Sequence, residues 1–569
     1  MDLRVERGDS RLNTSWSALL VSTQLEYIQI GDRYHYQGFL NERRKKLMDL
    51  VLAEMVTQSG KYIKEIANGV WLLLEESSWI WPAHLYLQKA GLGLPDPQQI
   101  VIDLGAGQTS AYIAWTQLLI GQKLSQISPI ISKRIDYELN RRIVRPFLDD
   151  PHMPWMGFDS YRFVDSNVGN NWNVWINSNI LMTALLCLPN TYRIQVIDRL
   201  VNSSDIFVNR YPNDGSDNEG PHYWVAAGGR LIQIISLLSS ASKNTINWSS
   251  NKLLKQTGDY IWKVHINENH FFNYGDSGAN EIPDSSVVFE YGKVFNDQTM
   301  KEFASYLTQL SGKDKIILDR LSSGELNQIG IQMSANVLLE NIPPKAPLPL
   351  ESWFPDLQLV TLRTTQESAK GIFLGIKAGI NDDTQHNHND VGSFILYVDG
   401  RPALIDVGSG TYTIKTFSPE RYSIWNFQSQ WHNIPTINGI QQGCGPKFMA
   451  NSVKYSHEAN ISIFEADISG AYPYEAQVDK WNRKWTFNRT TNVVKLTETY
   501  KLTQFIKFSK IHFITHLSIN KITNETIILG DNKTKLYIDF SENQVNVEMD
   551  CHLNDDPTIE QSNSYCITK

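Results

Sequence analysis

Hydrophobic and polar positions follow two different periods along the chain. Up to about residue 335, apolar residues recur three and four positions apart, as in 40–58, 64–78, 109–124 and 130–148. This spacing is typical of amphipathic helices, and it returns in 177–188, 191–211 and 228–242. Because short polar links join these segments, the sequence predicts antiparallel helical hairpins stacked side by side, with no strands between them. Such pairs can close into an incomplete ring with a cleft at one end.

The pattern changes at a proline-rich stretch, "ENIPPKAPLPLESWFP", at 340–355. After it, β-branched and alternating runs such as "GSFILYVDG" and "NVVKLTETYKL" are separated by turn signals, which predicts antiparallel strands packed as a β-sandwich. We therefore expect a helical domain at 1–335, a linker at 336–355 and a β-sandwich domain at 356–569.

Composition narrows the class of protein. The net charge of −8 argues against a nucleic-acid partner. The sequence shows no run of about 18 apolar residues, so we do not expect a membrane span. The first residues, "MDLRVERGDS", lack the apolar core of a signal peptide. This fits a cytoplasmic protein or a periplasmic or secreted one whose signal has been removed, and the second is our expectation. Cys551 and Cys566 either form a disulfide or remain free thiols.

Aromatic residues are numerous, with 16 Trp, 24 Tyr and 22 Phe. Most belong in cores, but several tryptophans have polar neighbours, as in "SSWIWPAH" and "GNNWNVWINSN". Aromatic faces beside polar groups are also how a cleft binds sugar rings. Trp172 and Trp224 are the candidates for this role.

One stretch of the predicted sheet carries a possible metal site. His386 and His388 are two residues apart in "QHNHND", and the predicted hairpin at "VDGRP" brings Asp406 back toward His388. With His432 from "QWHNIP", two histidines and one aspartate make a zinc set with an open position. Alternatively, Asp406 caps a turn and His432 bonds a backbone carbonyl.

Two stretches of the helical part carry further candidates. In "SNVGNNWNVW", Asn170 and Asn171 stand at a helix entry, where asparagine often serves only as a cap. In "DNEGPHYW", Tyr223 is either a packed core residue or a proton donor aimed into the cleft.

These blocks together resemble the heparinase II/III family of polysaccharide lyases. "HNHNDVGSFILYVDGRPALIDVGSGTYT" is similar to the family's signature, and "NNWNVWINSN", "DNEGPHYW" and "FSPERYSIWNFQSQWHNIPTING" resemble its other blocks, in the same order. The resemblance implies an incomplete (α/α) toroid followed by an antiparallel β-sandwich. It also implies a lyase that cleaves an acidic polysaccharide or oligosaccharide containing uronic acid, by β-elimination.

The resemblance further implies roles for individual residues. Tyr223 would be the acid and, when both protons lie on one face, also the base, and His386 would be the catalytic histidine. Asn170 or Asn171 would hold the substrate carboxylate, which has to be neutralised before the proton at C5 can leave. His388, Asp406 and His432 would bind a structural zinc. Three further residues join Trp172 and Trp224 as expected substrate contacts: Glu219, His222 and, as the basic group for an anionic polymer, Arg421.

Heparin or heparan sulfate is the first expected substrate, and alginate, hyaluronan or chondroitin are alternatives. Two other functions remain open on the same scaffold. One is a glycan-binding protein without catalysis. The other is a glycoside hydrolase, for which Glu219 and Asp390 could supply the two carboxylates.

Overall fold

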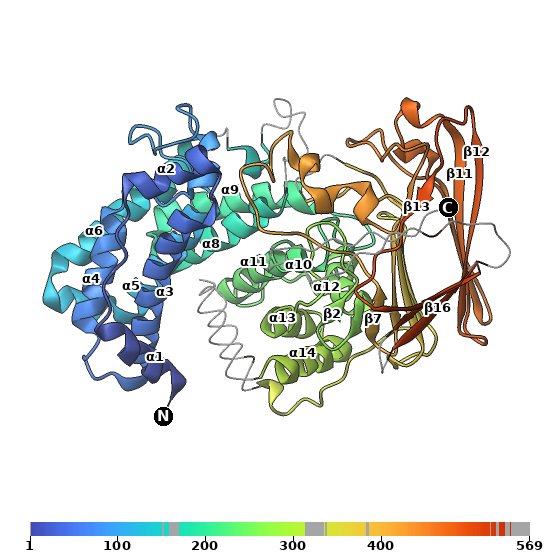
Figure 1. Cartoon of the computed structure of the whole chain (residues 1–569). Helices are drawn as coiled ribbons and strands as arrows, with labels where there is room; N and C mark the ends of the chain where they lie inside the picture. The colour runs from blue at the N-terminus through green and yellow to red at the C-terminus, as the bar shows by residue number, and fades with distance from the viewer. Residues whose placement is uncertain are drawn as a thin grey trace.

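The computed structural model describes residues 2–150, 153–158, 170–312, 335, 338–382, 386–523, 525–530, 534–540 and 547. Helices form the N-terminal part and antiparallel sheets the C-terminal part (Figure 1), which confirms the predicted fold class. The helices are α1 (Leu3–Leu12), α2 (Val21–Ile30), α3 (Tyr34–Thr57), α4 (Ile63–Glu75), α5 (Leu104–Ile127), α6 (Pro129–Leu139), α7 (Arg145–Asp149), α8 (Asn171–Cys187), α9 (Asn190–Val208), α10 (Pro221–Trp224), α11 (Gly228–Ala241), α12 (Lys252–Lys263), α13 (Ser285–Val294) and α14 (Gln298–Ser311).

The helices contact one another in a curved series rather than in one bundle. α3 contacts α1, α4 and α5, α5 contacts α8, α8 contacts α9 and α11, and α11 contacts α13. In Figure 1 the series runs from the blue helices α1–α6 to the green helices α10–α14, which lie beside the sheets. In that view α10–α14 lie between the N-terminal helices and the sheets, while the α2–α3 junction reaches the β domain through the bridge of Asp32 to Thr413.

One short hairpin interrupts the helical part, which the sequence did not predict. Strands β1 (His265–Asn267) and β2 (His270–Phe271) pair between α12 and α13. The chain then forms the turn 273–280, which contacts the β domain through Asn273 and the carbonyl of Asp406 at 3.1 Å.

The β domain has two principal antiparallel sheets. One has the order β3-β4-β5-β6-β7, and the other has the order β12-β11-β10-β9. The strands are β3 (Glu351–Phe354), β4 (Leu359–Arg363), β5 (Ile372–Lys377), β6 (Phe394–Val398), β7 (Arg401–Leu404), β8 (Pro435–Thr436), β9 (Asn451–Glu458), β10 (Ile461–Asp467), β11 (Val478–Asn488), β12 (Val493–Leu502), β13 (Lys510–Ile511), β14 (Ile519–Ile522), β15 (Thr526–Gly530) and β16 (Lys535–Asp539).

The five-stranded sheet is buried on both faces. All six residues of β5 are buried, whereas β10 alternates between buried and more accessible positions. Phe373 and Tyr397 pack with the helical core, while Leu374 and Leu396 pack with the second sheet. The sheet therefore joins the two domains. Successive side chains along its strands point alternately into the helical core and into the core shared with the second sheet, instead of alternately into a core and into solvent.

The predicted hairpin at "VDGRP" is present between β6 and β7. Asp399 and Gly400 have φ values of 50° and 76°, the left-handed pair that a tight two-residue hairpin requires. This turn sends the chain back, so that Asp406 ends near the start of β6 and near His388.

The structure also bears on the predictions for the linker, the membrane span and the C-terminal cysteines. The first strand of the β domain, β3, begins at Glu351, inside the segment predicted as linker. Among the described residues, the stretch Pro221–Ala241 has the length and composition of a membrane span, but 67% of its most apolar window is buried inside the protein, as expected for a core helix. Cys551 and Cys566 lie outside the described residues.

Candidate active site

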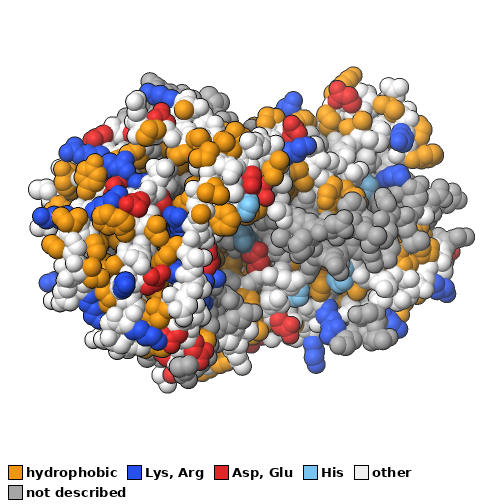
Figure 2. All heavy atoms as spheres, turned by 60° about the vertical axis from the view of Figure 1, so that its left-hand side comes forward, with side chains coloured by type: hydrophobic (Ala, Val, Ile, Leu, Met, Phe, Trp, Pro, Cys, Tyr) orange, Lys and Arg blue, Asp and Glu red, His pale blue; other side chains and the backbone are white. Residues whose placement is uncertain are grey.

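A cavity of about 700 Å³ lies where the helical series meets the β domain. Its lining comes from the α2–α3 junction, the start of α8, α10 and the β-domain loops around 386 and 412–418. Aromatic rings are frequent in this lining, among them Trp81, Trp172, Trp175 and Phe417. Figure 2 shows histidine side chains near the middle of one face, between the two parts of the molecule.

Tyr223 and His386 meet in this cavity, although 163 positions separate them in the sequence (386 − 223). Their ring centroids are 4.0 Å apart, and both residues line the cavity. Tyr223 is on the short helix α10, which starts with Pro221 after Gly220. Gly220 has φ +90°, and a Cβ there would lie 2.7 Å from the carbonyl oxygen of Tyr274. Only glycine fits this turn, and the turn aims Tyr223 into the cavity.

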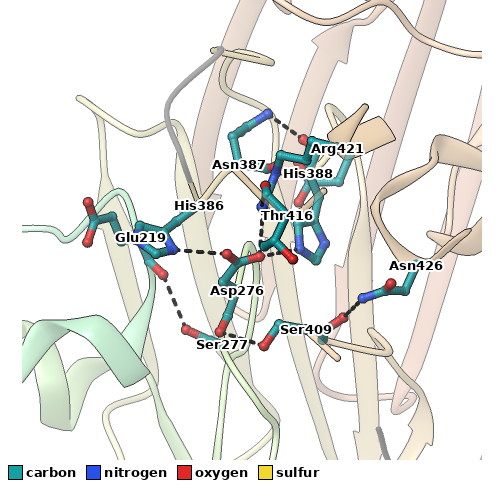
Figure 3. A network of polar contacts seen from close by, with 12 residues as sticks. Glu219, Asp276, Ser277, His386, Asn387, His388, Ser409, Thr416, Arg421 and Asn426 are labelled. Carbon is teal, nitrogen blue, oxygen red and sulfur yellow. Dashed lines mark hydrogen bonds and ion pairs between the residues drawn. The ribbon is translucent and has the colours of Figure 1, made fainter. Parts of the chain in front are cut away.

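One buried carboxylate, that of Asp276, organises the β side of the site (Figure 3). It accepts four hydrogen bonds, from His386 Nδ1 at 2.9 Å, His388 Nε2 at 2.9 Å, Arg421 Nη2 at 2.7 Å and Tyr412 Oη at 2.9 Å. Because a carboxylate only accepts, both histidines present an N–H to Asp276. In the neutral rings this leaves His386 Nε2 and His388 Nδ1 as acceptors.

The electrostatics follow from this arrangement. Burial would raise the pKa of Asp276, but the Arg421 charge and the histidine hydrogen bonds hold it well below its usual 3.8. Burial lowers the pKa of His386 against the opposing effect of Asp276. The pKa of Tyr223 is raised well above 10.0, chiefly by burial and then by the Asp276 charge. At neutral pH the site therefore combines a neutral imidazole with a protonated phenol.

The three predicted metal ligands converge. The ligand atoms of His388, Asp406 and His432 all lie within 4.8 Å of one another, and all three residues are buried. His432 Nδ1 is 2.7 Å from Asp406 Oδ2, while Asp406 Oδ1 accepts from the backbone N–H of Gly408 at 2.9 Å. The turn-capping role left open by the sequence is therefore real, but His432 bonds Asp406 and not a backbone carbonyl.

Two nitrogen atoms in this group have no hydrogen-bond partner among the described residues. They are His388 Nδ1 and His432 Nε2, and both are buried. An unpaired buried polar atom is costly, and a metal ion would satisfy both of these atoms. The other ring nitrogen of His388, Nε2, donates to Asp276. Histidines that bind a metal commonly donate their second ring N–H to a carboxylate in this way. The donor set and the unpaired nitrogens both fit a zinc ion.

The two asparagines of the α8 entry have different positions. The side chain of Asn170 accepts from the Trp172 N–H at 3.1 Å and caps α8, so Asn170 is a helix cap here. Asn171 lines the cavity, and its Nδ2 donates to Glu219 at 2.5 Å. Glu219 is buried and does not line the described cavity. It supports the Asn171 side chain and is not the substrate contact that the sequence predicted.

Two expected substrate contacts are wrong, because the side chains are buried elsewhere. Trp224 is 0% exposed, donates to the Thr257 carbonyl at 2.7 Å and packs in the toroid core. Arg421 is buried against Asp276 and the carbonyls of Asn387 and Thr416, so its charge is already compensated.

The remaining expected contacts, Trp172 and His222, both line the cavity. His222 is exposed and its Nδ1 pairs with Glu281. Asp390, considered for a hydrolase, is fully buried and paired with Lys377, so the described cavity does not contain the two carboxylates of that alternative.

Three residues of the site were not predicted: Asp276, Tyr412 and Arg33. Tyr412 Oη is 2.6 Å from Tyr223 Oη and joins it to Asp276. The sequence contains a weak signal for Asp276 and Tyr412. Asp276 lies in the glycine-flanked turn "YGDSGAN", and Tyr412 ends the family-like block already singled out.

A family model matches the β domain, which supplies several residues of this site. Residues 347–558 match the family model described as heparinase II/III-like, C-terminal. This confirms the resemblance seen in the sequence. No curated protein matches the sequence significantly.

Solved structures share the fold at low sequence identity. A heparan sulfate lyase HepC from Pedobacter heparinus has a TM-score of 0.62 and 13% identity, over 100% of this chain and 80% of that one. A heparinase III structure has a TM-score of 0.64 and 12% identity, over 99% and 86%. A heparinase III gene product has a TM-score of 0.59 and 14% identity, over 93% and 74%.

Proposed function

We propose that this protein cleaves a uronic-acid-containing glycan by β-elimination and leaves a 4,5-unsaturated uronate on the product. The observation that carries this proposal is the direct contact of Tyr223 with His386 in the lining of the interdomain cavity, with ring centroids 4.0 Å apart. β-Elimination needs a base at C5–H and an acid at the leaving oxygen, and the two side chains can supply these functions.

The proton balance assigns one role to each residue. His386 Nε2, neutral and free of Asp276, takes the proton from C5. The electron pair left at C5 forms the C4=C5 double bond, and the C4–O bond breaks. Tyr223, kept protonated by its raised pKa, donates its proton to the departing oxygen. Tyr412 and Asp276 connect the two residues by hydrogen bonds, which supports return of the proton to Tyr223 after each turnover.

Asn171 is the proposed contact for the carboxylate next to C5. Its amide lines the cavity and retains a second N–H beyond the one given to Glu219. Removal of the C5 proton places further negative charge beside that carboxylate, so a fixed amide donor favours the transition state. Glu219 holds the amide in place. Burial and the nearby Asp217 raise the Glu219 pKa well above 4.5, which favours its uncharged form.

A zinc ion is proposed at His388, Asp406 and His432. Bound there, zinc would supply structural cross-linking of the loops that follow β5 and β7 and precede β8. The proton transfers assigned above use only Tyr223 and His386. Asp276 contacts both His386 and His388, so the metal loops and the catalytic histidine share one support.

Heparan-sulfate-type glycans are the proposed substrates, because the fold is shared with lyases of that description. The test is a panel of heparan sulfate, heparin, hyaluronan, chondroitin and alginate oligosaccharides, followed by ultraviolet absorbance of the conjugated product. Absorbance on a uronide supports the proposal. Chain cleavage without that absorbance, or binding without cleavage, contradicts it. The periplasmic or secreted location stays a prediction.

A further inference from the structure

Arg33 and His386 both line the cavity and share Tyr412 and Phe417 as neighbours, and the backbone around Arg33 is fixed. It lies at the α2–α3 junction, next to Asp32, whose Oδ1 accepts from the N–H groups of Tyr34 and His35 at 2.8 and 2.9 Å. Asp32 also bridges to Thr413, and the Gly31 carbonyl accepts from Ile414 N at 3.3 Å. The first helices and the β domain thus fix this junction together.

The guanidinium of Arg33 is positioned by a buried histidine–aspartate pair. Arg33 Nη2 is 3.0 Å from His84 Nε2, and His84 Nδ1 is 2.7 Å from Asp103 Oδ2. Asp103 is 0% exposed, so its carboxylate fixes the histidine with Nδ1 protonated and Nε2 as the acceptor for Arg33. The Arg33 guanidinium carbon also lies 5.1 Å from the Phe417 ring centroid.

This arginine is electrostatically unusual in the cavity. Among the described residues that line the cavity, it is the one lysine or arginine. No carboxylate pairs with it among the described residues, whereas Arg421 is neutralised by Asp276. A guanidinium has five N–H donors, and only one is used by His84. The other donors have no hydrogen-bond partner among the described residues, and because Arg33 lines the cavity, they could bind a planar two-oxygen acceptor there.

We propose that Arg33, positioned by His84 and Asp103, binds the carboxylate of a uronate unit in the cavity and is the residue that selects acidic over neutral sugars. The inference rests on the proposed function, because it assumes that a glycan occupies the cavity. It replaces Arg421 as the basic group expected from the sequence. Trp172, which lines the cavity beside His84 at 4.3 Å between ring centroids, would provide an aromatic face for the same sugar.

The test measures binding and not turnover. In a Tyr223→Phe background, calorimetry compares an unsulfated tetrasaccharide of glucuronate and N-acetylglucosamine with the same tetrasaccharide whose carboxyls are reduced to alcohols. Arg33→Gln is expected to weaken binding of the acidic form by roughly 10- to 100-fold, the range of a charged hydrogen bond. Binding of the reduced form should be unchanged. Arg33→Lys should retain part of the preference, since it keeps the charge but loses the fork.

Arg145→Gln is the matched control, because Arg145 is an exposed arginine of α7 with 57% of its side chain accessible. It should bind both sugars as the parent does. If Arg33→Gln and Arg33→Lys both keep the full preference for the acidic form, or lose both sugars equally while folded, the inference is overturned.

His84→Gln tests the positioning role. We expect it to raise KM for the acidic tetrasaccharide several-fold in the otherwise wild-type enzyme, with kcat retained. A fall in kcat at constant KM would contradict that role. The two proposals fail separately. A wild-type protein that discriminates by charge but makes no unsaturated product refutes the elimination. Product formation with charge discrimination independent of Arg33 refutes the inference.

Discussion

Asp276 shows how one residue can connect catalysis with the architecture of the site. Its carboxylate contacts the proposed catalytic histidine, a predicted metal ligand and a buried arginine at once. Because it has no solvent exposure, its charge is compensated only by these partners, and each of them depends on it in turn.

Asp276→Asn should therefore reduce both stability and activity. The change leaves Arg421 buried without a counter-charge, which typically costs about 3–5 kcal/mol of unfolding free energy. It also removes the acceptor that orients His386. Urea unfolding measures the first effect. Asp198→Asn, an exposed aspartate on α9, should change stability by no more than about 0.5 kcal/mol. A fully stable Asp276→Asn protein would refute this account of the buried network.

Glu219 predicts an unusual pH dependence of stability. Burial and Asp217 raise its pKa well above 4.5, and the pKa of Asp217 is raised to about 6. A group with a raised folded-state pKa contributes stability below its unfolded pKa, and that contribution is lost as pH rises through the folded value. Wild-type thermal stability should thus decline as pH rises above about 4.5, and Glu219→Gln should flatten the decline.

The matched control for this measurement is Glu75→Gln, since Glu75 is an exposed carboxylate of α4. Its melting temperature should follow the wild-type pH profile. If Glu219→Gln also follows that profile, Glu219 is not the buried neutral carboxyl inferred from its surroundings.

Single residues also show where sequence reasoning succeeds and where it fails. The spacing of His386 and His388 predicted a shared site, because neighbouring positions in a strand-like segment are confined in space. Trp224 has the same polar neighbours as a cleft tryptophan, yet it is buried. The difference depends on how α10 turns against α12, which local sequence does not encode.

At the scale of elements, the proposed metal site depends on three loops that meet at one end of the five-stranded sheet. The loops before β6, after β7 and before β8 each supply one of the three proposed ligands. If zinc joins them, chelation should lower the melting temperature of the protein, because metal bound only by the native state stabilises that state. Metal analysis and thermal unfolding with and without chelator measure this.

Variants two residues apart separate the metal from the chemistry. His388→Ala should lose zinc and stability, whereas His386→Ala should lose activity and keep zinc, since the predicted ligands do not include it. Equal zinc content in wild type and His388→Ala would contradict the assignment of the ligands.

Elements were predicted best where a local signal defines them. The Asp399–Gly400 turn requires two residues in the left-handed conformation, and the dipeptide Asp-Gly predicts such a turn. The β1–β2 hairpin was missed because its strands have only three and two residues, too few to show a period. That omission also concealed Asp276, which lies in the turn that follows the hairpin.

At the scale of the whole molecule, the cavity exists because both ends of the helical series contact the β domain. Arg33 and His386 come from segments more than 350 positions apart (386 − 33 = 353), and no local pattern could place them together. The sequence therefore predicted an anionic substrate but assigned its basic partner to Arg421, which lies inside one of the family-like blocks.

The sparse positive charge of the cavity predicts a weak salt dependence. Exposed charges are screened over about 8–10 Å at ordinary ionic strength, and one arginine gives a shallow effect. KM for an unsulfated uronide should rise only a few-fold between low and high salt, and Arg33→Gln should remove most of that rise. A steep, unchanged salt dependence in Arg33→Gln would show that other cations bind the glycan.

The most direct test of the central claim compares Tyr223→Phe with wild type on a uronide oligosaccharide, by absorbance of the conjugated C4=C5 product. The substitution removes one hydroxyl and its bond to Tyr412, so folding and binding should persist. The account predicts that product formation falls by about 10²–10⁴-fold, the usual contribution of a general acid. A Tyr223→Phe enzyme that forms the unsaturated product at most of the wild-type rate would contradict it.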